Sequence, residues 1–449
     1  MKLIETPNTT RLLPAVALLL LSVTTAYLLF SPAHRRSAQR DKMQFVCLAW
    51  QEKALAAYKS VVSDWNKLHP ESEVEYIQGN WNSIQDYLVT GFETGDVADI
   101  IHYESSAIVD FGVRGYLEDL APLISDELKT DIQEVGWASV RRPNGEFVGV
   151  PLLLESLIIL FNRDHFAESG IVPPSLQHPW TWDEMRYAAR ALTKDTSGDG
   201  HIDRWGAGMG LRNSSNMILN LTIGFGGSYF RRENGAYVVR IGDNERKLLS
   251  LLMEMLYQDR SMSTAGLGLS GPAMIPSFCS GKYSMLVSIG AWSRQQLTQN
   301  APKGFRWGVL PPLKALTQQI GTSAQTLSIP KASTRKREAM AFIDFLANRE
   351  NMARVAAADW MVPARKSCLD LPKFQTTEDG WDVASRSAQY LAVGEWVGAP
   401  GYIEWKSRIA NPIFQELFAN RLAVDEAVKR IEEESNAVLR RYQQRDQRW

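Results

Sequence analysis

The sequence predicts an α/β protein built from two lobes that interleave along the chain. After the first forty residues, strand-like and helix-like segments alternate, which is the pattern of an α/β architecture. The chain has 449 residues, more than one typical domain, so two lobes or two domains are expected. No internal repeat and no low-complexity linker divides it into halves. We therefore expect the lobes to interleave instead of following one another as separate units.

An apolar segment near the N-terminus predicts export. Residues 12–30 carry no charge, Arg11 precedes them, and three arginines follow by residue 40. This length suits a transmembrane helix better than a signal-peptide core, although small residues at 31–33 keep a cleavable signal open. We assign residues 1–42 to a signal anchor or signal peptide with a linker. The remainder is expected in the periplasm or at the cell exterior, held to the membrane through this helix or secreted. No lipobox-like cysteine follows the apolar run, so lipid anchoring is not expected.

The first strands and helices are predicted from their apolar patterns. Residues 45–50 form a continuous apolar run, typical of a strand that is covered on both faces. An amphipathic helix over 55–68 and a half-buried strand over 74–76 follow, and 98–103 and 148–154 are predicted as two more buried strands.

The best-marked helix is predicted at residues 182–192. Thr181 and Glu184 form a capping box, and Trp180 and Met185 are spaced as a hydrophobic staple. Apolar residues three and four apart predict further helices at 339–346 and 424–439.

Composition argues against several classes of function. The 49 basic and 50 acidic side chains leave no electrostatic footprint for nucleic acid. The three cysteines lack C-x-x-C spacing, which disfavours a disulfide framework or a zinc site, and Cys47 is predicted as a buried thiol. The 14 tryptophans are more informative, because flat indole faces stack on the C–H faces of sugars.

No catalytic constellation is present, and no cofactor is expected. The six histidines are scattered, and H-E-x-x-H, Walker A, dinucleotide and G-x-S-x-G motifs are absent. Glu104 and Glu155 could form the carboxyl pair of a glycoside hydrolase. Because nothing in the sequence sets their separation, hydrolysis remains an alternative and a non-enzyme is predicted.

One loop matches the opening of an EF-hand calcium loop. Residues 195–203 place oxygen-bearing side chains at alternate positions, with glycine at the sixth. The candidate ligands are Asp195, Ser197, Asp199 and Asp203. The twelfth position is Gly206, where an EF-hand has a bidentate Glu, so Ca²⁺ binding and an Asx-rich surface turn both remain open.

Short motifs in a fixed order carry a resemblance to a known family. Residues 148–166 contain G-V-P followed by L-F-N-R-D-H-F, and 281–292 contain G-K-Y-S-M followed by A-W. Weaker matches lie at 94–100, 111–120, 181–193, 327–331 and 361–365. Over residues 43–440 these motifs resemble the extracellular solute-binding proteins of ABC sugar importers, the maltose-binding type. Ala98 departs from the pattern, since the family usually has proline there.

The resemblance implies a two-lobed periplasmic-binding-protein-like fold of type II. The first lobe would comprise residues 43–153 plus 323–366, and the second residues 154–322 plus 367–449. Ligands of such folds lie between the lobes at the carboxyl ends of strands. The implied function is a monomeric receptor that captures a carbohydrate and delivers it to the transmembrane subunits of an ABC permease. An anchored sugar sensor or scavenging module without transport is the alternative.

Several candidate ligand-binding residues follow predicted strands. Trp50 and Gln51 come after the first strand, Asn80 and Trp81 after the second, and Glu104 after the third. Indole, amide and carboxylate groups are the groups that stack on sugar rings and bond to their hydroxyls. Structural roles for these residues, as rim packing, turn or helix cap, remain open.

The other candidates come from later segments. Glu155 interrupts an apolar run and needs a polar partner, and the matching Glu of the family contacts the sugar. By the same resemblance, Trp292 is the aromatic of a G-x-W motif and the best stacking candidate of the second lobe. Gln325 follows Ser323-Ala324, where the family usually has two glycines. Trp360 precedes a P-A-R segment, at a place where an aromatic residue or glycine of the family often lies against the cleft.

Overall fold

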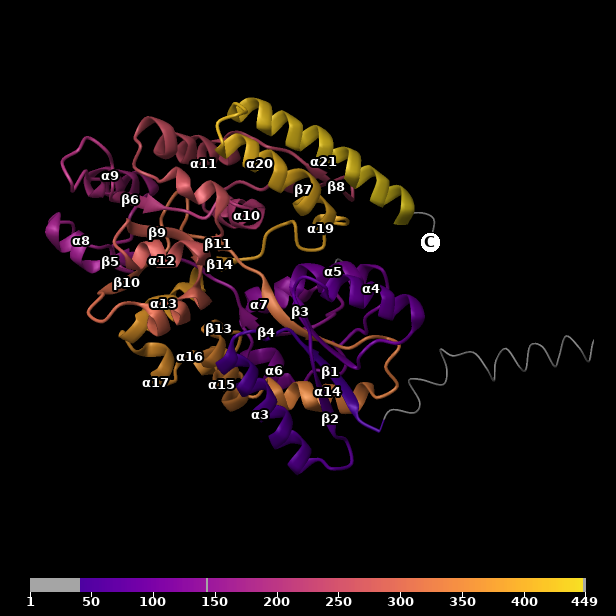
Figure 1. Cartoon of the computed structure of the whole chain (residues 1–449). Helices are drawn as coiled ribbons and strands as arrows, with labels where there is room; N and C mark the ends of the chain where they lie inside the picture. Colours follow the sequence, from indigo (N-terminus) through magenta and orange to yellow (C-terminus); the bar gives the residue numbers. More distant parts are fainter. Residues whose placement is uncertain (1–40, 143, 447–449) are drawn as a thin grey trace, which may run out of the picture.

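Two β-sheets organise the computed structural model, which describes residues 41–142 and 144–446 (Figure 1). The first sheet has six strands in the order β13-β4-β12-β3-β1-β2. These strands are β1 (Met43–Cys47), β2 (Val74–Gln78), β3 (Ile100–Glu104), β4 (Val150–Leu154), β12 (Ala324–Ser328) and β13 (Val362–Pro363). β1 runs parallel to β2 and β3, whereas β12 runs antiparallel to β3 and β4. We call this sheet with its helices the first lobe.

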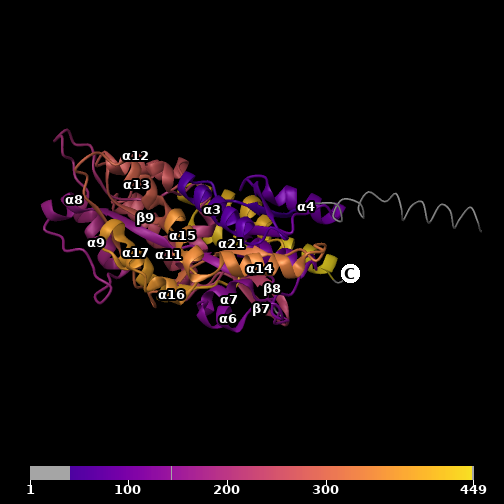
Figure 2. The ribbon, with the colours of Figure 1, turned by 90° about the horizontal axis from the view of Figure 1, so that it is seen from below.

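Helices cover both faces of the first sheet, as the continuous apolar run of residues 45–50 predicts. They are α3 (Glu52–Leu68), α4 (Ile84–Thr94), α5 (Ser105–Val113), α6 (Asp126–Asp131), α7 (Glu134–Val140), α14 (Lys336–Leu346) and α15 (Arg349–Asp359). Phe45 and Cys47 of β1 belong to the apolar cluster that includes α3 and α14, and Val46 and Leu48 to the cluster with α4 and α5. Alternate residues thus pack against opposite layers. Figure 2 shows α3, α14 and α15 together on one side.

The second lobe is built on a four-stranded sheet in the order β10-β5-β9-β6. Its strands are β5 (Leu157–Asn162), β6 (Trp205–Gly208), β9 (Tyr283–Gly290) and β10 (Trp307–Leu310). Its helices are α8 (Arg163–Glu168), α9 (Trp182–Leu192), α10 (Ser215–Thr222), α11 (Asp243–Met253), α12 (Ile275–Cys279), α13 (Arg294–Asn300), α20 (Asn411–Phe418) and α21 (Val424–Asp446). A hairpin of β7 (Phe230–Glu233) and β8 (Ala236–Val239) packs against α21. In Figure 1, α11, α20 and α21 lie together at the outer edge.

Helix α9 begins and ends where the sequence predicts. The Thr181 hydroxyl accepts a hydrogen bond from the Glu184 N–H at 3.1 Å, and the Glu184 carboxylate accepts one from the Thr181 N–H at 2.6 Å. The predicted capping box is therefore confirmed.

The chain passes between the sheets at residues 155–156, which join β4 to β5, and at residues 322–323, which join β11 (Ile320–Gly321) to β12. The two crossings are bonded to each other. The Glu155 N–H donates to the Ser323 carbonyl at 2.9 Å, and the Thr322 hydroxyl donates to the Glu155 carbonyl at 2.5 Å. Two of the three predicted lobe boundaries, 153/154 and 322/323, lie at or within two residues of these crossings, and the division of the chain into lobes, with its third boundary at 366/367, stays a prediction.

A later segment contacts both lobes. β14 (Leu391–Ala392) pairs with β11 beside the second crossing, and Val397 packs against the apolar cluster that includes α5. The links between the lobes are therefore made by several segments that lie side by side.

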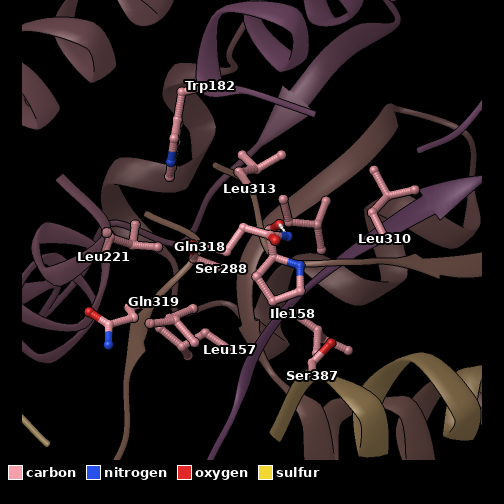
Figure 3. Close-up of a pocket in the computed structure, with 14 residues that line it drawn as sticks. Leu157, Ile158, Trp182, Leu221, Ser288, Leu310, Leu313, Gln318, Gln319 and Ser387 are labelled. Carbon is pink, nitrogen blue, oxygen red and sulfur yellow. Dashed lines mark hydrogen bonds between the residues drawn. The ribbon is translucent and has the colours of Figure 1, made fainter. Parts of the chain in front are cut away.

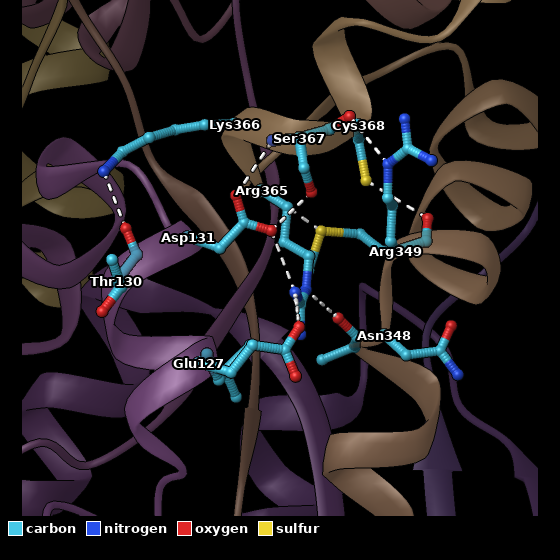
Figure 4. A network of polar contacts seen from close by, with 12 residues as sticks. Glu127, Thr130, Asp131, Asn348, Arg349, Arg365, Lys366, Ser367 and Cys368 are labelled. Atoms are coloured by element: carbon cyan, nitrogen blue, oxygen red, sulfur yellow. Dashed lines mark hydrogen bonds and ion pairs between the residues drawn. The ribbon is translucent and has the colours of Figure 1, made fainter.

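A polar network around Arg365, the residue before α16 (Lys366–Leu369), joins α6 to the chain that follows β13 (Figure 4). Arg365 is 3% exposed and bonds to Glu127 and Asp131 of α6 at 2.8 and 2.9 Å. Its Nε donates to the Ala347 carbonyl, and Asp131 also accepts from the Ser367 N–H at 2.9 Å. A guanidinium that is fully used in this way joins the N-terminal part of the lobe to the segment that returns after residue 324.

The predicted N-terminal helix lies outside the described residues. Among residues 41–142 and 144–446, no helix combines the length and apolar character that a bilayer span requires.

Candidate ligand-binding site

A cavity of about 370 Å³ lies where the strand ends of the first lobe meet the second lobe. Its lining residues are Trp50, Trp81, Glu104, Glu155, Asn216, Trp292, Ser323, Ala324, Gln325, Asp359 and Met361. Trp292 in the turn after β9 and Asn216 of α10 come from the second lobe, and most of the others come from the first lobe or the crossings. This volume falls in the range of small-molecule sites.

Six of the nine ligand-binding residues predicted from the sequence share this cavity. They are Trp50, Trp81, Glu104, Glu155, Trp292 and Gln325. Their role in binding stays a prediction, but the fold brings together side chains that are up to 275 positions apart in the sequence. The sequence analysis missed Asn216, Ser323, Ala324, Asp359 and Met361.

Two indoles from different lobes meet at the cavity. The rings of Trp50 and Trp292 are 5.5 Å apart between centroids and stand at 86°, an edge-to-face arrangement. Trp50 is 58% exposed, so much of its surface is available to a ligand. Trp81 donates its indole N–H to the Leu48 carbonyl at 2.8 Å, which fixes the ring beside Tyr103.

Gly290 explains the local sequence before Trp292. A Cβ atom at Gly290 would lie 2.4 Å from the indole nitrogen of Trp292, closer than any real contact allows. Glycine is therefore required for the ring to fold back over the end of β9. This steric requirement explains the glycine of the G-x-W motif in this chain.

Glu155 occupies an unusual electrostatic position. It lies in the crossing between two strands whose side chains are entirely buried. Burial, and after it the charge of Glu104, raise the pKa of its carboxyl to about 7 against a smaller opposing effect of Lys406. The carboxyl therefore gains and loses its proton near neutral pH.

Gln325 is oriented by a chain of hydrogen bonds that starts in the core. The Leu48 N–H donates to His102 Nδ1 at 3.2 Å, so the His102 proton must be on Nε2, which lies 2.9 Å from Gln325 Oε1. Burial lowers the pKa of His102 to about 4, which keeps the ring neutral at pH 7. The Gln325 amide group then donates toward Met361 Sδ at 3.0 Å and toward Asp359.

Asp359 is a buried acid at the end of a helix. It is the last residue of α15 and is 3% exposed. Burial raises the pKa of its carboxyl to about 7, and the hydrogen bond from Gln325 opposes this rise. The negative end of the helix dipole also disfavours an anion there. A carboxyl group at the last position of a helix is the signal that the sequence analysis overlooked.

Three predicted residues lie outside the cavity and have structural roles. Gln51 is buried as the residue before α3 and does not cap that helix with its side chain. Asn80 uses its side-chain oxygen to accept from the Asn82 N–H at 2.8 Å, which stabilises the turn before α4. Trp360 is buried and stacks on Trp381, with 5.2 Å between the two ring centroids. Gln51 and Asn80 thus occupy the packing and turn positions that the sequence left open, and a ligand-binding role of the three residues stays a prediction.

The candidate calcium loop is arranged as an Asx-rich turn. Asp195 accepts from two backbone N–H groups at 2.6 and 2.7 Å, Asp203 from two at 2.9 and 3.0 Å, and Asp199 from one at 2.9 Å. The Ser197 hydroxyl donates to Asp195 at 3.1 Å. Within the described residues, no group of three or more His, Cys, Asp or Glu side chains could hold a metal ion. Calcium binding stays a prediction.

A second hollow inside the second lobe is too small for a sugar. It is lined mainly by apolar side chains such as Leu157, Leu221 and Leu310, with Trp182 at one side (Figure 3). Its volume is about 30 Å³, well below that of small-molecule sites. It is best described as a packing gap beneath α9.

A sequence profile of the bacterial extracellular solute-binding proteins matches residues 49–353. The chain belongs to this family. The resemblance seen in the sequence motifs is thereby confirmed. An uncharacterized lipoprotein of Streptomyces antibioticus is 36% identical to this family member over 380 residues, covering 84% of this chain and 82% of that protein.

Solved structures confirm the fold class. An ABC substrate-binding protein of Listeria monocytogenes in complex with cycloalternan has a TM-score of 0.72 at 21% identity, covering 89% of this chain and 98% of that one. The sugar-binding protein MalE of Xanthomonas citri has a TM-score of 0.75 at 18% identity with the same coverage. The two-lobed periplasmic-binding-protein-like fold follows from these likenesses.

Cys47 differs from the lipid-bearing cysteine that a lipoprotein requires. It is the first cysteine of the chain, lies in β1 and is fully buried. Burial raises the pKa of its thiol to about 12. Cys47 is therefore a core thiol, as predicted.

Proposed function

We propose that this solute-binding protein captures a carbohydrate between its two lobes and delivers it to the transmembrane subunits of an ABC importer. The observation that carries the proposal is the convergence of three indole rings and three carboxyl groups on one cavity of about 370 Å³. Indole faces match the apolar faces of sugar rings, and carboxylate and amide groups match their hydroxyls. The protein would act outside the cytoplasm, tethered or secreted, as a monomer.

The solved relatives support the class of ligand. The Listeria monocytogenes protein was solved with cycloalternan, and a receptor of Streptomyces glaucescens was solved with acarbose. These ligands were bound to those two proteins, and they motivate binding tests of oligosaccharides with this chain.

The arrangement of the crossings supports capture by lobe closure. The ligand cavity draws residues from both lobes, and the chain joins the lobes through hydrogen-bonded crossings at its edge. A ligand that contacts both lobes stabilises the closed state over the open one. Closure would then create the composite surface that a permease recognises.

Calorimetry against mono- and oligosaccharides tests the proposed ligand. Trp292→Ala and Glu155→Ala should each weaken sugar binding by about tenfold or more, because each removes a major contact of the site. Tyr187→Ala, an exposed aromatic on α9 far from the cavity lining, is the matched control and should bind normally. Normal binding by both site variants would discard this site.

Delivery to an importer needs a separate test. The liganded protein should stimulate ATP hydrolysis by a reconstituted ABC importer from the same organism, whereas a sensor or scavenging module would bind sugar without this effect. A sugar-binding protein that stimulates no importer would favour the second reading.

Glycoside hydrolysis is a second candidate because of one observation. Glu104 and Glu155 line the same cavity, and the pKa of Glu155 is raised to about 7, as in a general acid beside a carboxylate. Family membership favours binding. Release of reducing sugar that is abolished in Glu155→Gln would instead establish hydrolysis.

A further inference from the structure

The charge of the cavity wall is unbalanced. Glu104, Glu155 and Asp359 contribute three carboxyl groups, and no Lys, Arg or His is among the eleven lining residues. The remaining polar side chains of the wall are amides and a hydroxyl. A guest in this cavity therefore meets acidic groups without meeting a basic one.

Other enclosed carboxylates of the described residues are held by a basic partner or by hydrogen bonds, as Asp99 is by the Gln44 N–H and the Ser333 hydroxyl. Asp131 pairs with Arg365 at 2.9 Å, and the fully buried Glu245 pairs with Arg231 at 3.3 Å. Across residues 41–142 and 144–446, none of the three cavity carboxyls forms an ion pair, and the side chain of Glu155 has no hydrogen bond. Such groups are costly to enclose unless a partner arrives.

The backbone offsets the charge of one carboxyl only. Glu104 directly precedes α5, whose N-terminus favours an anion. Asp359 instead ends α15, where the partial charge of the helix is negative, and Glu155 lies in a crossing outside any helix. Glu155 and Asp359 are therefore the two uncompensated groups.

Two basic side chains approach the wall from behind without lining it. Arg294 is fully buried, donates to the Trp360 carbonyl at 3.2 Å, and lies 4.3 Å from the centroid of the Trp381 ring. Lys406 lies over the Tyr402 ring at 5.8 Å, and it lowers the pKa of Glu155 by less than burial raises it. Neither replaces a cation inside the cavity.

The indoles add a second attraction for positive charge. Trp50 and Trp292 stand at 86° to each other, and Trp81 contributes a third ring to the same cavity. A cation over an indole face is attracted by the ring, and more strongly where water is excluded. Indoles with unpaired carboxylates form a surface that is complementary to an ammonium group.

We propose that the ligand of this site is an amino sugar, alone or within an oligosaccharide, whose protonated amine is bound by Glu155 and Asp359 beside an indole face. The inference rests on the proposed function and narrows it to a class of carbohydrate. The hydroxyl groups of the amino sugar contact the amide groups of Asn216 and Gln325. Lobe closure excludes water, so a guest that balances the two carboxylates is favoured over a neutral sugar of the same shape.

Calorimetry with matched glycans tests this charge preference. Oligosaccharides of cellulose, chitosan and chitin share one glucan backbone. At the same ring position the cellulose series carries a hydroxyl, the chitosan series an ammonium group and the chitin series an uncharged acetamide group. Glucose, galactose and mannose, each paired with its 2-amino derivative, extend the comparison to single rings. In at least one of these sets, the amino sugar should bind about tenfold tighter than its neutral counterparts. This difference in affinity corresponds to the free energy of one charge-assisted hydrogen bond.

Charge-removing variants locate the preference. Glu155→Gln and Asp359→Asn keep the shape of each side chain, and each should reduce amine binding by about tenfold more than it reduces binding of the neutral counterpart. Glu52→Gln is the control, because it removes an exposed carboxylate from the first turn of α3 outside the cavity. Circular dichroism establishes that each variant is folded.

The outcomes separate this inference from the proposed function. Equal or tighter binding of the neutral sugars would overturn the amine preference and leave a carbohydrate receptor. An amine preference that persists in both site variants would also overturn it. Failure of every glycan to bind would reject the carbohydrate function together with this inference.

Discussion

Asp359 combines two features that destabilise the folded chain. Its carboxyl is almost fully buried, and it lies at the end of α15 where the helix dipole disfavours an anion. Its neighbour Gln325 provides a hydrogen bond but no positive charge. Buried groups of this kind are typical of binding sites, in which stability is exchanged for a contact with the ligand.

Asp359→Asn should therefore stabilise the empty protein at alkaline pH. Burial raises the pKa of the folded-state carboxyl from 3.8 to about 7, so the folded state binds more protons than the unfolded state between these values. The free energy of unfolding of the wild type consequently falls as pH rises through this window, and the variant lacks this loss. Urea unfolding should show a gain on the order of 2 kcal/mol at pH 8.

The same measurement at low pH is the internal control. Near the unfolded pKa of the aspartate, both proteins carry a neutral side chain there and should have similar free energies of unfolding. A variant that is less stable than the wild type at pH 8 would contradict the burial of an uncompensated charge.

Gly290 sets the position of Trp292. Gly290→Val should displace the indole, since even a Cβ atom would lie 2.4 Å from its ring nitrogen. We expect sugar affinity to fall by about tenfold or more, together with a change in tryptophan fluorescence. Gly235→Ala is not a suitable control, because its φ of +81° strains any side chain; Gly268→Ala is suitable, since its added Cβ would meet open space.

The sequence did not distinguish between neighbouring residues at the ends of strands and helices. Trp50 lines the cavity and Gln51 does not, Trp81 does and Asn80 does not, and Asp359 and Met361 do while Trp360 between them does not. The sequence placed each pair at a strand or helix end, which was enough to locate the cavity. It did not determine which member faces the ligand, because that depends on side-chain direction along the chain.

At the scale of elements, the strands of the first lobe were predicted best. The ends of the predicted strands at 45–50, 98–103 and 148–154 lie within three residues of the ends of β1, β3 and β4. Asn216 was missed for a reason at this scale. Helix α10 reaches the cavity from the second lobe, and its approach depends on how the lobes meet, which no local pattern encodes.

The Arg365 network joins α6 to the chain just after β13, and so anchors the segment that follows Met361 of the cavity wall. Arg365→Met should destabilise the protein by about 3 kcal/mol, since it leaves Asp131 half-buried without its cation. Chemical denaturation measures this. Arg240→Met, which breaks an exposed pair with Glu233, should change the free energy of unfolding by less than about 0.5 kcal/mol.

At the scale of the whole molecule, the interleaving of the lobes was predicted from the lack of a linker, and the family motifs supplied the crossings. The cavity depends on both, since Trp50 and Trp292 meet only when the lobes are close. The opening angle of the empty protein is a property of the ensemble and has no signature in sequence.

Ligand binding should make the molecule more compact. Because the cavity is lined by both lobes, a bound sugar favours the closed arrangement, and small-angle scattering should record a smaller radius of gyration with sugar than without. Trp292→Ala, at sugar concentrations that saturate the wild type, should show a weaker contraction. An unchanged radius in the wild type would mean that binding occurs without closure.

Glu155 belongs to the cavity and to the joint at once. It contributes to the cavity wall, while its backbone is tied to Ser323 and Thr322 of the neighbouring crossing. A substitution at Glu155 that changes the sugar specificity should therefore also change the angle between the lobes in the empty protein. A fluorescent sensor that reports lobe motion would need recalibration after each such substitution.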